Sequence, residues 1–333
     1  MQKILIIQTA FIGDVILATA LIEKLHAHFP EAQIDFLLRK GNEGLLAGHP
    51  YIRQRWIWDK KHGKYKSLFK LIRQIRRERY DVVVNLQRFF STGLLTALSG
   101  ARQRLGFDKN PLSFTFTRHL PHAFGTDAEP IHEVERNLSL IAHLTDSTFT
   151  KPHLYPPPVL PDQLDTRIPY ICLAPTSVWY TKQWPLEKWV GLLDRLPQDH
   201  RLFLLGGPTD QGACAVLQAQ TQHPMVENLA GKLNLLESAR LMQGAVMNYV
   251  NDSAPLHLAS AVDAPVTAIF CSTVPAFGFY PLSSRSSIVQ TTATLDCLPC
   301  GLHGKKACPE GHFKCSHIAV EQLLQPLQNK EAL

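Results

Sequence analysis

The chain has 333 residues, of which 45% are hydrophobic and 19% are charged, a composition typical of a globular protein. This length predicts about two domains, and the net charge of +6 favours an anionic ligand or surface. No stretch reaches about 18 apolar residues, which excludes a membrane-spanning helix. The first residues predict a buried strand rather than a signal peptide, so we expect a cytoplasmic protein with reduced or metal-bound cysteines.

Strands alternate with helices through the first half of the sequence. Strands are predicted at 3–9, 34–38, 55–58 and 81–86, and helices after Gly13-Asp14 and at 65–79, 91–99 and 133–144. From 105 to 130 the sequence predicts loops. The alternation is typical of right-handed βαβ units around a parallel sheet.

Residues 150–169 are rich in proline and predict a domain junction, because proline cannot continue a helix or a central strand. A second alternating series follows, with strands at 170–174, 201–205, 247–251 and 266–270 and helices at 186–196, after Asp210, at 235–243 and at 255–262. The predicted fold is therefore α/β, with two Rossmann-like domains at 1–155 and 156–333 that face each other across a cleft.

The stretch 247–261 predicts a strand, a polar break and a helix. Asp252 or Ser253 is a suitable N-cap, and Pro255 suits the first helical turn. A helix that begins at the carboxyl end of a parallel strand directs free N–H groups toward the ligand crevice. The small side chains of Ser253 and Ala254 leave room for a phosphate there, although an ordinary capped turn has the same pattern.

Two further segments follow strand ends. Asp14, at the start of the first helix, is either a charge that matches the helix dipole or a general base. Its segment has a single glycine, so the dinucleotide fingerprint is absent. After the strand at 170–174, Thr176 and Ser177 offer hydroxyls and Lys182 offers a cation suited to phosphate.

Four motifs together resemble glycosyltransferase family 9, the ADP-heptose:lipopolysaccharide heptosyltransferases. They are Ile-Gly-Asp-Val-Ile-Leu-Ala-Thr at 12–19, Lys-Gln-Trp-Pro-Leu-Glu-Lys-Trp at 182–189, Leu-Leu-Gly-Gly-Pro at 204–208 and Asn-Asp-Ser-Ala-Pro-Leu-His-Leu-Ala at 251–259. The resemblance implies a GT-B fold, with the acceptor bound by the N-terminal domain and the nucleotide sugar by the C-terminal domain. It also implies inverting transfer without a metal ion, and the absence of an Asp-x-Asp triplet agrees with this.

Carried over by position, the resemblance makes Asp14 the general base that deprotonates the acceptor hydroxyl. Lys182 would stabilise the departing diphosphate. Thr176 and Ser177 match hydroxyl residues near the phosphates, and Asp252 matches an acidic residue that contacts the sugar.

Three positions of the same motifs are less closely matched. Ser253 and Ala254 match backbone donors at the helix N-terminus, although the family usually has glycine where this chain has Ala254. His257 falls on a family histidine, which is also consistent with a purely structural residue. An acidic contact to the ribose is expected from Glu237, unless Leu236 occupies that position.

A run of basic residues precedes and covers the predicted helix at 65–79: Lys60, Lys61, Lys64, Lys66, Lys70, Arg73, Arg76, Arg77 and Arg79. A solvated helix face is one interpretation, and a surface that contacts the inner membrane near a Kdo–lipid A acceptor is another. Nucleic acid is not an expected partner, because no aromatic stacking pattern or known binding motif accompanies the run.

Four cysteines lie within a loop at 297–315: Cys297, Cys300, Cys308 and Cys315. Their spacing is compatible with a structural zinc site, and disulfides or free thiols are the alternatives. A zinc ion bound by four thiolates would have no open position for catalysis, so no cofactor is expected for the reaction itself.

The sequence therefore predicts an inverting, metal-independent heptosyltransferase of the lipopolysaccharide inner core, using ADP-heptose and a Kdo–lipid A or heptosylated acceptor. It would act at the cytoplasmic face of a Gram-negative inner membrane. The alternatives are a GT-B transferase for another nucleotide sugar, a related epimerase, and a non-catalytic nucleotide-sugar-binding module.

Overall fold

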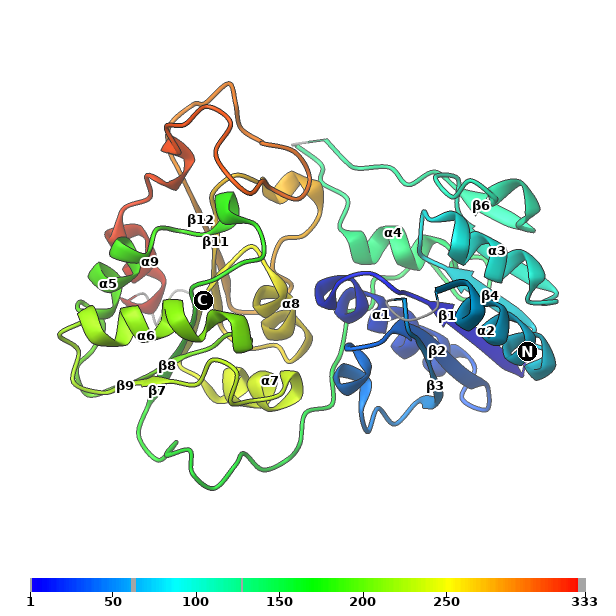
Figure 1. The fold of residues 1–333 in the computed structure, drawn as a ribbon, viewed down its shortest axis with the longest axis horizontal. Helices are drawn as coiled ribbons and strands as arrows, with labels where there is room; N and C mark the ends of the chain where they lie inside the picture. The colour runs from blue at the N-terminus through cyan, green and yellow to red at the C-terminus, as the bar shows by residue number, and fades with distance from the viewer. Residues whose placement is uncertain (1, 61–63, 127, 329–333) are drawn as a thin grey trace. The chain divides into compact units, whose positions relative to one another are not determined.

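The computed structural model describes residues 2–60, 64–126 and 128–328 (Figure 1). The chain divides into two compact units. The first unit contains 1–125 and 131–155, and the second contains 126–130 and 156–333. The crossing between Tyr155 and Pro156 falls within the proline-rich stretch.

The first unit is built around a six-stranded parallel sheet with the order β3-β2-β1-β4-β5-β6. Its strands are β1 (Lys3–Ile7), β2 (Gln33–Arg39), β3 (Ile52–Trp58), β4 (Val82–Asn85), β5 (Gln103–Phe107) and β6 (Arg118–Leu120). Its helices are α1 (Ile12–His28), α2 (Lys64–Glu78), α3 (Phe90–Leu98) and α4 (Glu133–Ser139), with short 3-10 helices η1 (Glu43–Leu46) and η2 (Ser113–Thr115).

The loops predicted at 105–130 are wrong in part, because β5 and β6 lie there. Strand β5 pairs with β4 and β6 although it contains Gly106. The glycine is required by packing, since a Cβ at this position would lie 2.5 Å from the ring of Phe116. Helix α4 also ends earlier than predicted, at Ser139.

Buried apolar residues dominate the central strands of this sheet, as expected for a parallel sheet covered on both faces. Helices α2 and α3 cover one face, where the leucines and isoleucines of α2 pack against Leu5, Leu37 and Val83. Helix α1 packs against α4. Right-handed crossovers that step in opposite directions along a sheet lie on opposite faces, so α1 covers the face opposite α2.

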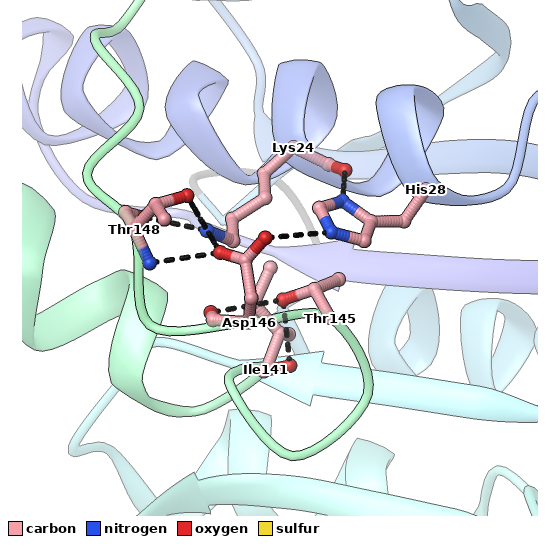
Figure 2. Close-up of polar contacts among 6 residues, drawn as sticks. All are labelled: Lys24, His28, Ile141, Thr145, Asp146 and Thr148. Atoms are coloured by element: carbon pink, nitrogen blue, oxygen red, sulfur yellow. Dashed lines mark hydrogen bonds and ion pairs between the residues drawn. The ribbon is translucent and has the colours of Figure 1, made fainter.

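The chain that follows α4 is attached to α1 by a buried lysine (Figure 2). The Lys24 ammonium donates to a carboxylate oxygen of Asp146 and to Thr148 Oγ1 at 3.1 Å. His28 Nε2 lies 2.9 Å from the other oxygen of Asp146. These bonds from Lys24, followed by those from Thr148, hold the pKa of Asp146 well below its usual range.

The second unit repeats the same strand order, β12-β11-β10-β7-β8-β9. Its strands are β7 (Tyr170–Ala174), β8 (Arg201–Leu204), β9 (Val226–Asn228), β10 (Met247–Asn251), β11 (Val266–Phe270) and β12 (Ser286–Gln290). Its helices are α5 (Leu186–Leu193), α6 (Gln211–Gln220), α7 (Leu235–Gly244), α8 (Ala254–Ala261) and α9 (Val320–Gln328). Short 3-10 helices are η3 (Tyr180–Lys182), η4 (Pro208–Asp210), η5 (Pro275–Phe277) and η6 (Lys314–Ser316).

Each sheet has one point where the strand order reverses, between β1 and β4 and between β7 and β10. Ligands of open parallel sheets bind beside the carboxyl ends of the strands at such a point. Two Rossmann-like units are therefore confirmed, each with its own candidate binding edge. Within the part of the chain that the structure describes, no helix combines the length and apolarity needed to cross a bilayer.

Candidate active-site residues in the two units

The reversal point of the second unit is held together by Asn251, the last residue of β10. Its buried side chain donates to the Pro175 carbonyl at 2.8 Å and accepts from the Trp184 backbone N–H at 3.0 Å. The loop after β7 and the loop after β10 are thereby fixed against each other. Trp184 and Trp189 pack in the core of the unit.

Lys182 and Asp252, which are far apart in the sequence, meet at this point. The Lys182 ammonium lies 2.6 Å from Asp252 Oδ2, and both side chains are largely buried. Thr273 Oγ1 donates to the same oxygen at 2.6 Å. The ion pair with Asp252 fixes the position of the Lys182 ammonium. A lysine cation in a fixed position is suited to bind a phosphate group.

Helix α8 begins directly after Asp252. Ser253 is its N-cap and makes no side-chain capping bond, and Ala254 and Pro255 form the first turn. The partial positive charge of this helix end therefore lies next to the carboxylate that binds Lys182. The buried ring of His257, one turn further, packs against Phe279 with ring centroids 6.2 Å apart.

The remaining predicted residues are placed as follows. Thr176 and Ser177 follow β7 and are half-buried at the neighbouring strand end. Glu237 lies in the first turn of α7, where its carboxylate accepts from the Asn234 backbone N–H at 2.8 Å. Leu236 is buried in the core, so the polar group at this helix start belongs to Glu237.

The cysteine-rich loop forms part of the support of Lys182. Thr181 exchanges two bonds with Lys305, from Thr181 N to the Lys305 carbonyl at 3.1 Å and from Lys305 N to Thr181 Oγ1 at 2.8 Å. Ser272 Oγ donates to Thr181 Oγ1 at 2.9 Å. Gly304 has a φ of +74°, and a Cβ there would lie 2.8 Å from Lys182 Cγ. Sequence reasoning missed Ser272, Thr273 and Gly304, because no local motif links them to the lysine.

The four cysteines of this loop are free thiols that lie near one another. Burial and neighbouring thiols raise the pKa of Cys300, and they raise that of Cys315 to about 11. Cys297 Sγ lies 3.9 Å from His312 Nε2. Across the described ranges, however, no group of three or more His, Cys, Asp or Glu residues is arranged to hold a metal ion. A zinc site at these four cysteines therefore stays a prediction from the sequence.

Asp14 lies in the first turn of α1, at the reversal point of the first sheet. Its carboxylate accepts from the Phe11 backbone N–H at 3.1 Å, which gives it a helix-capping role. Burial, followed by the negative charge of Glu133, raises the pKa of Asp14 to about 6. A carboxylate with this pKa is ionised at neutral pH and still basic enough to accept a proton.

Glu133 belongs to a buried cluster that the sequence analysis did not identify. His122 Nε2 lies 3.2 Å from one of its oxygens, and Arg136 Nε donates to it at 2.7 Å. Although burial alone would raise the pKa of Glu133, the bond from His122 and the charge of Arg136 lower it. The spacing of Glu133 and Arg136 at the start of a helix is the sequence signal that could have indicated this ion pair.

The two Rossmann-like units, with a lysine and a helix N-terminus at the reversal point of the second, define an α/β protein of the GT-B type. The comparisons with known proteins agree. The model of glycosyltransferase family 9 (heptosyltransferase) matches residues 68–312. This chain therefore belongs to glycosyltransferase family 9.

Individual relatives support this assignment over most of the chain. Lipopolysaccharide heptosyltransferase 3 of Escherichia coli K12 is 31% identical over 287 residues, covering 78% of this chain and 80% of that protein. Lipopolysaccharide heptosyltransferase 1 of Pseudomonas aeruginosa is 26% identical over 335 residues, covering 92% and 87%. The solved ADP-heptose lps heptosyltransferase II of E. coli has a TM-score of 0.80 at 22% identity and covers 98% of both chains.

Proposed function

We propose that this chain transfers heptose from ADP-heptose to the inner core of lipopolysaccharide, with inversion at the anomeric carbon and without a catalytic metal ion. The observation that carries the proposal is the Lys182–Asp252 pair beside the N-terminus of α8. Support for the donor and the acceptor comes from the names of the relatives, and one solved heptosyltransferase at a TM-score of 0.73 and 19% identity is bound to ADP.

In the proposed reaction, each unit supplies a different group. Asp14 of the first unit accepts the proton of the acceptor hydroxyl as that oxygen attacks C1 of heptose, and the bond from C1 to the diphosphate breaks. Lys182 and the backbone N–H groups at the start of α8 stabilise the charge that develops on the departing ADP. Thr176 and Ser177 bind near the phosphates, Asp252 and His257 near the sugar, and Glu237 near the ribose.

The acceptor of such an enzyme carries lipid, either as Kdo–lipid A or as its heptosylated form. The proposed place of action is therefore the cytoplasmic face of a Gram-negative inner membrane, with peripheral contact and no role for nucleic acid. The exposed basic side chains of α2 support this contact.

The donor is tested by thermal unfolding with ADP, GDP and UDP in parallel, with and without added divalent metal. A nucleotide at about 100 times its dissociation constant should raise the free energy of unfolding by about 2.7 kcal/mol. We expect stabilisation by ADP without metal, followed by transfer from ADP-heptose with inverted configuration in NMR spectra of the product. A preference for UDP or GDP would mean that the donor carries that nucleotide and not ADP, while the fold assignment would be unaffected.

A structural zinc ion in the loop at 297–315 stays a prediction from the sequence. The four thiols lie in one loop, but their described arrangement is not that of a metal site. Metal analysis of protein purified under reducing conditions checks it, and the prediction expects about one zinc ion per chain, as in sites with four thiolates. Protein without zinc, equally active and equally stable after treatment with a chelator, would remove the zinc from the proposal.

A further inference from the structure

The outer face of α2 and α3 carries an unusual combination of side chains. The inward side of α2 is fully used by the core, where Leu68, Leu71, Ile72 and Ile75 pack against the sheet. The outward side therefore makes no contribution to the core of the unit. Its composition is free to serve another purpose.

The outward side of α2 is strongly basic. Its exposed cations are Lys66, Lys70, Arg73, Arg76 and Arg77. The acidic residue of the helix, Glu78, is bound by Lys3 at 3.0 Å and by Arg53 at 2.8 Å. Within the described ranges, none of the five outward cations forms an ion pair, so their charge faces solvent.

Large apolar side chains stand among these cations. Tyr65 and Phe69 of α2 are 69% and 59% exposed, although they lie one helical turn apart on the same side. At the start of α3, Phe89 and Phe90 are 50% and 57% exposed, and Leu98 at its end is 38% exposed.

The two helices place these groups on one surface. Helix α2 packs beside α3, and both run opposite to the strands of the sheet (Figure 1). Their C-terminal ends are neighbours, since a Cβ on Gly100 would lie 3.6 Å from Arg76 Cγ. The N-terminal parts, which carry Tyr65, Phe69 and Phe90, consequently lie at the same edge of the sheet.

Exposed aromatic rings surrounded by cations match a lipid–water interface. Aromatic side chains prefer the headgroup level of a bilayer, and lysine or arginine near the surface is attracted by anionic lipids. Nucleic acid fits less well, because proteins that stack bases place their rings along a charged groove. These rings stand on the outer sides of two helices.

We propose that the outer face of α2 and α3 docks this protein on a bilayer that contains anionic phospholipid. The cations bind the headgroups, and the rings of Phe69 and Phe90 enter the interface. The inference rests on the lipid-borne acceptor proposed above and identifies the surface that brings the enzyme to it.

The test is sedimentation of the full-length protein with vesicles of pure phosphatidylglycerol and of pure phosphatidylcholine. The unmodified protein should bind the anionic vesicles and lose them at high salt. Since each lysine near an anionic surface contributes about a fivefold factor, Lys66→Gln/Lys70→Gln should weaken binding at least tenfold. Phe69→Ser should weaken it about tenfold, because one ring leaves the interface.

Matched controls lie elsewhere on the protein. Lys232→Gln/Lys314→Gln removes the same charge from exposed sites of the second unit. Phe149→Ser removes a ring that is 44% exposed. Phe149 follows Thr148, which is hydrogen-bonded to Lys24 of α1 on the opposite face of the first sheet. Neither control should alter vesicle binding. Equal losses of vesicle binding in test and control variants, or no vesicle binding by the unmodified protein, would overturn the proposal. The proposal would also fail if the unmodified protein bound an oligonucleotide and no vesicles, and the test variants lost the oligonucleotide binding.

A transfer assay with a lipid-free acceptor distinguishes an error in the docking surface from an error in the proposed function. With a water-soluble core oligosaccharide that lacks lipid, the docking variants should transfer heptose at the rate of the unmodified protein. If no protein transfers heptose to this acceptor while vesicle binding follows the predicted pattern, the function is wrong and the docking surface stands. Slow transfer by the docking variants alone would assign Lys66, Lys70 and Phe69 to the chemistry instead of docking.

Discussion

Asp14→Asn is expected to reduce heptosyl transfer by a factor of about a hundred to ten thousand, while donor nucleotide binding stays unchanged. The amide retains an oxygen for the Phe11 N–H but cannot accept the acceptor proton. In the unmodified enzyme the rate should fall about tenfold per pH unit below about 6, because burial and Glu133 raise the pKa of Asp14 to about 6 and the protonated form is inactive. A pH–rate profile of kcat/KM checks this.

The same raised pKa makes a second prediction about stability. Since the pKa of Asp14 in the folded state lies above its ordinary value of 3.8, ionisation opposes folding. This penalty is absent below pH 3.8, grows between 3.8 and about 6, and is complete above that range. Asp14→Asn should therefore raise the unfolding temperature at pH 8 and leave it unchanged near pH 4. Equal stability of both proteins at pH 8, together with full activity of the variant, would make Asp14 an ordinary helix-capping residue.

Lys182→Met is the second large prediction, with kcat/KM lowered about a hundred- to thousandfold and weaker donor binding. Among the described residues, Lys182 is the only side-chain cation paired with Asp252 at the start of α8, and the substitution removes it. Steady-state kinetics and calorimetric titration with ADP measure both effects. Unchanged kinetics would exclude Lys182 from the reaction.

The experiment must separate a loss of chemistry from damage to the fold. Among the described residues, Lys182→Met leaves the buried Asp252 carboxylate with the Thr273 hydroxyl as its remaining side-chain partner. Lys182→Met/Asp252→Asn removes that unpaired charge and serves as the stability control. If the double variant regains stability but not the transfer rate, the lower rate is caused by the missing cation. Gly304→Ala reaches the same lysine from the cysteine-rich loop, and by crowding Lys182 Cγ it should weaken ADP binding with the lysine still present.

Much of the fold could be predicted from the sequence because its central strands are short runs of buried β-branched and aliphatic residues. Val82–Asn85 and Val266–Phe270 are examples, and the predicted strand 266–270 has the observed bounds. The strands that the sequence analysis missed lie at or next to the edges of the sheets. There, pairing with a neighbouring strand determines whether a segment forms a strand, and its amino-acid composition does not. β5 begins with Gln103 and Arg104, and β12 begins with two serines. Helix α9 was missed because it contains Pro326, a residue that normally ends a helix.

The candidate site was predictable only where its residues follow strand ends. Lys182, Ser253 and Asp14 could be named as candidates because position after a parallel strand is a local signal. The pairing of Lys182 with Asp252 depends on contacts across many residues, and so does the bond from Thr273. The roles of Glu133 and Gly304 likewise arise from packing, which no pattern along the chain reports.

The identical strand order in both halves has a consequence for how this family can diversify. Each half has its own reversal point, so the groups proposed for the sugar donor and those proposed for the acceptor belong to separately folded cores. Relatives named heptosyltransferase 1, 2 and 3 all resemble this chain over most of its length. An exchange of halves between relatives, joined in the proline-rich stretch, is then a practical route to new acceptor specificity.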